Sequence, residues 1–269
     1  MPGYGYGISD FISSSKSAAT SGGGGETKFV MEVTIPSDTF VFTFDMVTYN
    51  VANNMNIDWG DGSSDSGVTA TIPHTYATAG VYDIKVDGVG NFAGYQNHEV
   101  TNIKNWGNSD FKFTSLYQGF YQCNYINYTA TDYPNLSNLA TTNTNARKID
   151  SAFRTNVSTG SPTSYEFSNW IDTDKFTAHN YAFYYNWTGT LLDLTGWDFS
   201  NSLQMTSVFS YFGYGKLPSE VTIKIPNITF NSALSPVKIA GMFKASHCDD
   251  FDMPIFDFSN VLATNVSVS

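Results

Sequence analysis

Apolar and polar residues alternate in short runs in the first third of the chain, and turn-forming residues separate the runs. Alternation with a period of two is typical of β-strands that have one buried and one exposed face. The pattern therefore predicts a small antiparallel β-sandwich over 28–92. Its strands are expected at 29–35, 40–44, 55–57, 74–76 and 81–86.

A second pattern occupies the rest of the chain, where a short motif recurs about every 30 residues. Its clearest copies begin at Leu194, Ile225 and Met253, alternate apolar with polar positions and end in a Ser/Asn pair. This order predicts a short strand followed by a turn.

A second marker accompanies the motif, namely a phenylalanine reached through small and polar residues. Copies of this marker phenylalanine lie at Phe120, Phe153, Phe183, Phe209 and Phe243. One such repeat cannot bury its apolar face alone, so neighbouring repeats must stack. The sequence therefore predicts an elongated, mainly β solenoid over 98–269.

The central signature of the first region is Ile57-Asp-Trp-Gly-Asp-Gly62. Gly60 and Gly62 suit backbone positions with positive φ, and Asp58 or Asp61 can hydrogen-bond its own turn. Trp59 is expected in the core. Tyr76, before a turn at Gly80, is expected to donate its hydroxyl to the backbone.

This signature, followed by His-Thr-Tyr-x-x-x-Gly-x-Tyr from His74, resembles the PKD-like immunoglobulin-type domain. The segments 100–107 and 113–123 resemble the first repeat of BspA-type leucine-rich-repeat surface proteins. In that family a PKD-like cap often precedes the repeats. The resemblance implies a binding or display function, found on bacterial surfaces and in phage structural proteins.

Residues 1–25 begin with a Gly/Tyr segment and end in Ser21 and four glycines, a composition typical of a flexible linker. They contain neither the positive nor the apolar region of a secretory signal. The first 20 residues are expected to dock onto other virion proteins. The alternative is that these residues form a disordered tail with no function.

Composition narrows the function classes. Charged residues make up 14% of the chain and aromatic residues 16%, and the net charge is −11. Polarity thus comes from Ser, Thr, Asn, Gly and Tyr, which is typical of extracellular or virion proteins. Nucleic acid is not expected as a partner, because phosphate binding requires clustered Lys and Arg. No apolar run is long enough for a transmembrane helix, so no membrane partner is expected.

Residues with catalytic or metal-binding chemistry are few. Asp58, Asp61 and Asp65 alternate like calcium ligands, yet their spacing equally fits a hairpin turn, which is the preferred interpretation. Cys123 and Cys248 are several repeats apart, too far for a disulfide. The four histidines lack zinc-ligand spacing. We therefore expect no metal, no cofactor and no enzyme activity.

Glycoside cleavage is a minor alternative, since it needs two nearby carboxylates on one face. The candidates for a polysaccharide depolymerase are Asp172, Asp174, Asp193, Asp198 and Asp257. Asp198 and Asp257 occupy the same motif position between apolar residues, which predicts an outward, solvated location.

Aromatic residues near the marker phenylalanines are the better functional lead, because there are more of them than a thin repeat core can bury. Amphipathic rings of this kind suit sugar stacking or protein interfaces; core packing is the alternative. The candidate surface comprises Tyr117, Tyr121, Tyr125, Tyr184, Tyr185, Trp187, Tyr211 and Tyr214.

These observations favour a virion structural protein of a phage, such as a spike, fibre or capsid decoration, that binds a host surface glycan or protein. A bacterial cell-surface adhesin is the alternative. Because fibre proteins are often trimers, this assignment is compatible with a homo-oligomer, although the sequence contains no heptad repeat of a coiled coil.

Overall fold

The computed structural model describes residues 26–46, 52–94, 96–139, 147–156, 162–231, 237–246, 250–251, 255–257, 259 and 266–268. The expected anchor at 1–25 and Cys248 lie outside these residues. The described chain is mainly β, as predicted, with two three-residue 3-10 helices, η1 (Thr173–Lys175) and η2 (Pro218–Glu220). Within this part, no helix has the length and apolarity to cross a membrane.

The first region consists of two antiparallel sheets. All five predicted strands are present, and a further strand, β4, pairs with β3. The residues of β4 are mostly exposed, so its sequence lacks the apolar alternation that would predict a strand. The strands are β1 (Phe29–Ile35), β2 (Phe40–Phe44), β3 (Asn54–Asp58), β4 (Ser64–Val68), β5 (Ile72–Tyr76) and β6 (Gly80–Gly90). One sheet runs β4-β3-β6-β1, and β2 pairs with β5 in the other.

Strand β7 (Val100–Trp106) joins the first region to the second. It is antiparallel to β1 on one side and parallel to β9 (Asn127–Tyr128) on the other. Strand β8 (Phe111–Phe113) pairs parallel to β6. The core is continuous across this junction, because Trp106 lies edge-on to Trp170 with ring centroids 5.0 Å apart.

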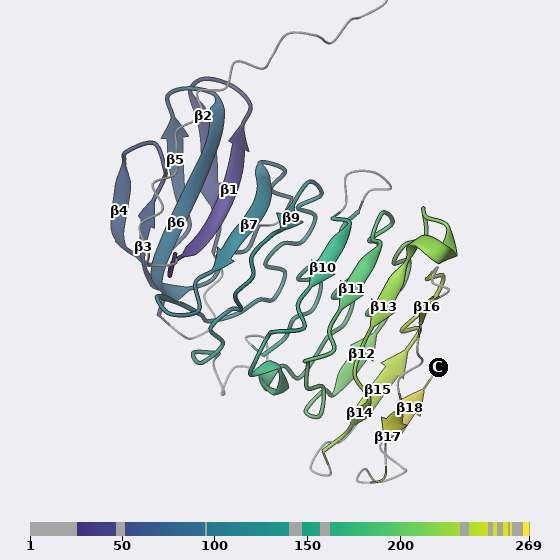
Figure 1. Ribbon diagram of the computed structural model, residues 1–269. Coiled ribbons are helices and arrows are strands. Elements are labelled where there is room, and N and C mark those ends of the chain that lie inside the picture. Colours follow the sequence, from purple (N-terminus) through teal and green to yellow (C-terminus); the bar gives the residue numbers. More distant parts are fainter. Residues whose placement is uncertain are drawn as a thin grey trace, which may run out of the picture.

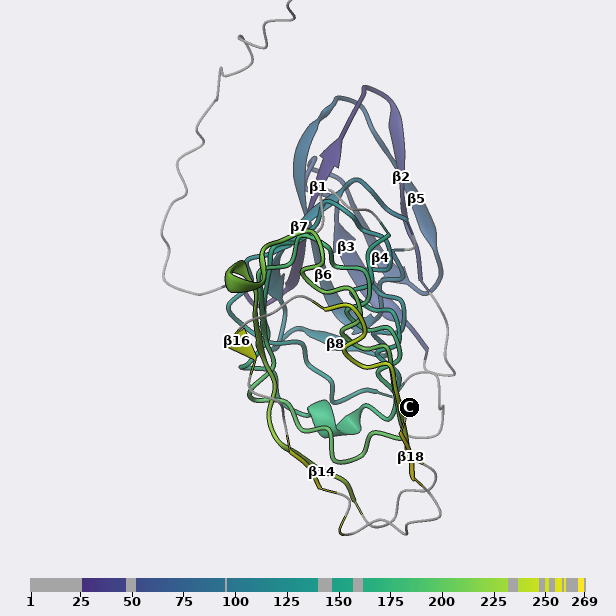
Figure 2. The same ribbon diagram turned by 90° about the vertical axis from the view of Figure 1, so that its right-hand side faces the viewer.

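The second region is a stack of coils whose strands form three parallel ladders (Figures 1 and 2). In the first ladder a single residue of each strand is buried where burial is described: Tyr165, Leu192 and Ile223. Such short strands carry no detectable period. The ladders are β10 (Ser164–Glu166), β11 (Leu191–Asp193), β13 (Thr222–Lys224) and β16 (Asp250–Phe251); β12 (Gln204–Thr206), β15 (Val237–Ala240) and β18 (Val266–Val268); and β14 (Ile228–Thr229) with β17 (Phe256–Asp257).

The predicted motif strands are only partly present. In β14 and its flank, Ile228 and Phe230 are buried and Thr229 is exposed, as the alternation predicts. The copy that begins at Leu194 forms turns without a strand, so that prediction was wrong. There, the Asp198 amide donates to the Thr173 hydroxyl rather than to a ladder carbonyl.

The marker phenylalanines form a column through the stack. Rings in successive coils, from Phe120 to Phe243, are stacked with centroids between 5.2 and 6.0 Å apart. The amides of the first four each donate to a carbonyl of the next coil at 2.9 Å. Because the column fixes where each coil turns, it also fixes where the neighbouring side chains emerge.

Candidate aromatic binding surface

The residues next to the marker phenylalanines emerge in register from successive coils. Tyr121, Arg154 and Tyr184 each follow a marker phenylalanine directly, and Tyr185 and Tyr211 follow at the second position. These five side chains are partly exposed, whereas Ser210, which directly follows Phe209, is buried. Coils joined by parallel hydrogen bonds lie about 4.8 Å apart, which is close to the separation of stacked rings.

Ring contacts connect these side chains into one continuous surface. Tyr184 and Tyr185 have centroids 4.6 Å apart, and Tyr185 and Tyr211 are 4.9 Å apart. Trp187 extends the contacts to Tyr214 at 5.0 Å. We call this surface the aromatic ladder. It comprises Tyr121, Arg154, Tyr181, Tyr184, Tyr185, Trp187, Tyr211 and Tyr214.

Arg154 is the one cationic member of the ladder. Its guanidinium carbon lies 5.0 Å from the ring centre of Tyr184 and 5.2 Å from that of Tyr121. A third ring, Tyr181, is 5.7 Å away. Since Tyr121 and Tyr184 belong to the coils before and after Arg154, the guanidinium sits between two rings of equivalent position. Each cation–π contact of this kind contributes about 0.5–1 kcal/mol.

Six of the eight predicted surface residues belong to the ladder, and two lie elsewhere. Tyr125 is 55% exposed and meets His98 edge-on. Tyr117 is partly buried, outside the described ring contacts of the ladder. The prediction missed Tyr181 and Arg154. Arg154 shares its offset from the marker phenylalanine with Tyr121 and Tyr184, so the repeat register was the signal that would have found it.

Three ladder tyrosines occupy an unfavourable backbone region. Tyr181, Tyr185 and Tyr211 have φ of 57°, 65° and 61°. For an L-residue this left-handed conformation costs about 1 kcal/mol. Burial raises the pKa of Tyr184, and its neighbours Tyr185 and Tyr211 add to that shift, so the ring stays neutral at physiological pH. Two ladder groups, Nε of Arg154 and Nε1 of Trp187, are buried without a hydrogen-bond partner among the described residues.

The signature turn of the sandwich has the predicted geometry. The Tyr76 hydroxyl donates to the Trp59 carbonyl at 2.9 Å, and Trp59 is fully buried. Asp58 accepts from the Gly60 amide and Asp61 from the Ser63 amide, both at 2.9 Å.

The glycines of this turn also match the prediction in part. Gly60 and Gly62 have φ of 79° and 93°, and a Cβ at Gly60 would meet the Asp83 carbonyl at 2.7 Å. A turn was predicted at Gly80, but Gly80 is the first residue of strand β6, so that prediction was wrong. Asp65 accepts from the Trp59 indole at 2.8 Å, so these acidic residues are occupied by the turn itself.

Four of the five candidate catalytic carboxylates are likewise held by local contacts. Asp193, Asp198 and Asp257 each accept a backbone amide two residues further along, as in an Asx turn. Asp172 pairs with Lys175 at 2.9 Å. Asp198 is exposed, as its motif position predicts. Asp257, beside Thr229 in the β14–β17 ladder, is partly buried, so its predicted outward location is confirmed only in part.

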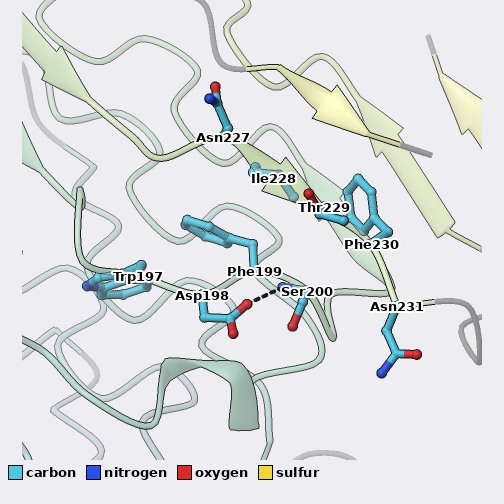
Figure 3. A pocket seen from close by; sticks show the side chains of 9 residues that line it. All are labelled: Trp197, Asp198, Phe199, Ser200, Asn227, Ile228, Thr229, Phe230 and Asn231. Atoms are coloured by element: carbon cyan, nitrogen blue, oxygen red, sulfur yellow. Dashed lines mark hydrogen bonds between the residues drawn. The ribbon is translucent and has the colours of Figure 1, made fainter. Parts of the chain in front are cut away.

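Asp198 also lines a groove of about 590 Å³ between 197–200 and 227–231 (Figure 3). Phe199, Ile228 and Phe230 are buried beneath it, and Ser200, Asn227 and other polar residues form its rim. Figure 3 shows the Asp198 carboxylate turned toward the Ser200 backbone. Among the described lining residues Asp198 is the one carboxylate, whereas glycoside hydrolysis generally uses two.

Comparison with protein-family models, curated proteins and solved structures finds no match. The candidate site therefore rests on geometry. The aromatic ladder combines rigid rings, a cation and unpartnered polar atoms on adjacent coils, and the groove offers a single carboxylate held by its own turn. We take the ladder as the candidate functional site.

Proposed function

We propose that this protein is a non-enzymatic structural protein of a phage virion, a spike, fibre or capsid decoration, which binds a glycan on the host cell through the aromatic ladder. A PKD-like sandwich and a leucine-rich-repeat-like solenoid form its rigid support on the virion surface. Residues 1–20 attach it to other virion proteins. The observation that carries the proposal is the unbroken series of ring contacts from Tyr181 to Tyr214.

A glycan fits this surface better than a protein partner does. Tyrosine and tryptophan rings pack against the C–H faces of sugars while their polar atoms hydrogen-bond hydroxyl groups. Rigid rings with two rotatable bonds also lose little entropy on binding. Repetition from coil to coil suits a ligand that is itself a chain of repeated units.

Glycan binding is tested with the double variant Tyr184→Ala/Tyr211→Ala, with Tyr125→Ala as the matched control. Tyr125 is an exposed tyrosine of the same region outside the ladder. We expect the double variant to bind host cells about tenfold or more weakly, because two stacking rings are lost, and the control to bind normally. Unchanged binding of the double variant contradicts the proposal. So does wild-type binding that survives periodate oxidation of cell glycans but not protease treatment, which would indicate a protein receptor.

The virion assignment is tested separately by mass spectrometry of purified phage particles and of bacterial envelopes from the same source. We expect peptides of 29–85 to be recovered with capsid and tail proteins at a fixed copy ratio. Recovery from envelopes alone would make the protein an adhesin. Glycan binding would then still be tested by the tyrosine variants, independently of the virion assignment.

A further inference from the structure

We infer that the aromatic ladder selects an anionic saccharide, one that bears carboxylate, sulfate or phosphate groups, and that Arg154 binds the anionic group. The inference rests on the proposed glycan-binding function and adds the class of ligand. It depends on the placement of one cation between rings and on the partners that this cation lacks.

Rings from the two adjacent coils contact the guanidinium. Tyr121 and Tyr184 lie at 5.2 and 5.0 Å, one from each adjacent coil. A third ring, Tyr181, lies 5.7 Å from the guanidinium carbon and is nearly perpendicular to Tyr184. The N–H donors of a guanidinium lie in its plane as a rigid fork. A planar donor edge of fixed orientation matches the two oxygens of a carboxylate, sulfate or phosphate.

No protein group uses that edge among the described residues. None of the ion pairs there includes Arg154, and no hydrogen bond of its side chain is present. Its Nε is buried without a partner, whereas its two terminal nitrogens are not among the buried unpartnered atoms. By contrast, Nε of Arg147, on the same coil, donates to the Lys175 carbonyl at 2.8 Å. Arg154 thus keeps a constant positive charge and unused donors within the ladder.

The charge of the rest of the protein makes the assignment specific. The net charge is −11, so the protein as a whole repels anions. An acidic sugar therefore gains electrostatic attraction from a local cation and not from the overall charge of the protein. In the ladder that cation is flanked by rings that stack on the sugar, so charge recognition and ring stacking act on one ligand.

The test is an array of uronate, sialyl, sulfated and phosphorylated oligosaccharides, each beside its neutral parent; for the uronates the parent is the carboxyl-reduced oligomer. We expect the wild-type protein to bind at least one acidic member about tenfold or more tightly than its parent, as a charged hydrogen bond implies. Arg154→Gln should bind both members of that pair equally, at the level of the parent. The array also identifies which anionic group is recognised.

Lys244→Gln is the matched control. Lys244 directly follows the last marker phenylalanine, so it occupies the position equivalent to Arg154, and it is exposed outside the ladder. It removes the same charge and should leave the preference intact. Arg154→Lys keeps the charge but loses the planar fork, so we expect an intermediate preference with unchanged binding of the neutral parent. This variant serves as the test if Arg154→Gln lowers the melting temperature and binds neither member.

The outcomes separate the two levels of the proposal. Equal wild-type affinity for acidic and neutral members, or an unchanged preference in Arg154→Gln, overturns the role of Arg154 and leaves glycan binding in place. Wild-type protein that binds no member of the array overturns both.

Discussion

The sandwich and the stacked coils make tight turns in different ways. In the described residues from β1 to β6 (29–46 and 52–90), positive φ falls on glycine at four positions and otherwise on Thr39. In the coils it falls mainly on larger residues, two positions before or after a marker phenylalanine. These are Gln118, Gln122, Ser151, Tyr181, Tyr185, Ser207, Tyr211 and Ala245, with Gly241 as the glycine of the series.

This difference shows where each region gets its stability. The sandwich turn at 58–63 is made by its own residues, because Asp58 and Asp61 bond amides two positions on. A coil turn depends on its neighbours, since its amides donate to the next coil and its phenylalanine stacks there. Contacts with neighbouring coils therefore compensate the backbone strain of a coil turn, whichever side chain occupies the left-handed position.

The largest expected effect tests this dependence on neighbours. Phe209 is fully buried between Phe183 and Phe243. Phe209→Ala should lower the free energy of unfolding by about 3–5 kcal/mol, measured by chemical denaturation. Hydrogen exchange should accelerate in the coils around 183–243 and stay slow in β1–β6, because repeats contact mainly their neighbours. An unchanged melting temperature would remove Phe209 from the core.

A second effect is the acid sensitivity that one buried histidine gives to the coils. His179 is buried, and burial lowers its pKa to about 3. In the unfolded chain its pKa is about 6.5, so between these values only the unfolded state binds the proton. Stability is therefore complete above about pH 6.5 and falls by about 1.4 kcal/mol per pH unit as the pH drops toward 3.

The control for acid sensitivity is His179→Gln, which removes the titrating group. We expect a flatter dependence of the unfolding free energy on pH between 6.5 and 4 in this variant. Parallel pH profiles for the two proteins would mean that other groups cause the acid loss.

A smaller effect concerns the turn chemistry of the sandwich. Tyr76→Phe removes the hydroxyl that bonds the Trp59 carbonyl in the core. We expect a loss of about 1–2 kcal/mol, the cost of leaving a buried acceptor without its partner. Tyr82→Phe is the control, since the Tyr82 hydroxyl bonds Thr78 at an exposed site. Equal losses in the two variants would show that burial does not decide the cost.

The smallest effect exchanges the turn strategies of the two regions. Ser207 has φ of 51°, and Gly241 has φ of 54° at the equivalent position of the next coil. Ser207→Gly should stabilise the protein by at most about 1 kcal/mol, and Gly241→Ala should destabilise it by a similar amount. Thermal unfolding of both variants checks the pair. Destabilisation by Ser207→Gly would mean that the serine contributes more than its backbone strain costs.

The sandwich was largely predictable because its determinants are local. Strands such as β1 and β2 show the alternation of apolar and polar residues that predicts a strand. Trp59 and Tyr76 have the predicted locations and contact. Strand β4 was missed, since its exposed residues lack the pattern. In the coils, the marker phenylalanines were found in sequence, but the strands β10, β11 and β13 were not. Three residues with one buried side chain offer no period to detect.

The candidate site, too, was predictable only in part from the sequence. Sequence determined that the repeat exists, that the marker phenylalanines are its core and that aromatic residues crowd around them. Tertiary structure alone decided which of these rings meet, separating Tyr117 and Tyr125 from the ladder and bringing Tyr181 and Arg154 into it. The physical reason is register: hydrogen bonds between coils place residues about 30 positions apart within one strand spacing, and the exact lengths of the intervening turns, which follow no period, set which side chains coincide.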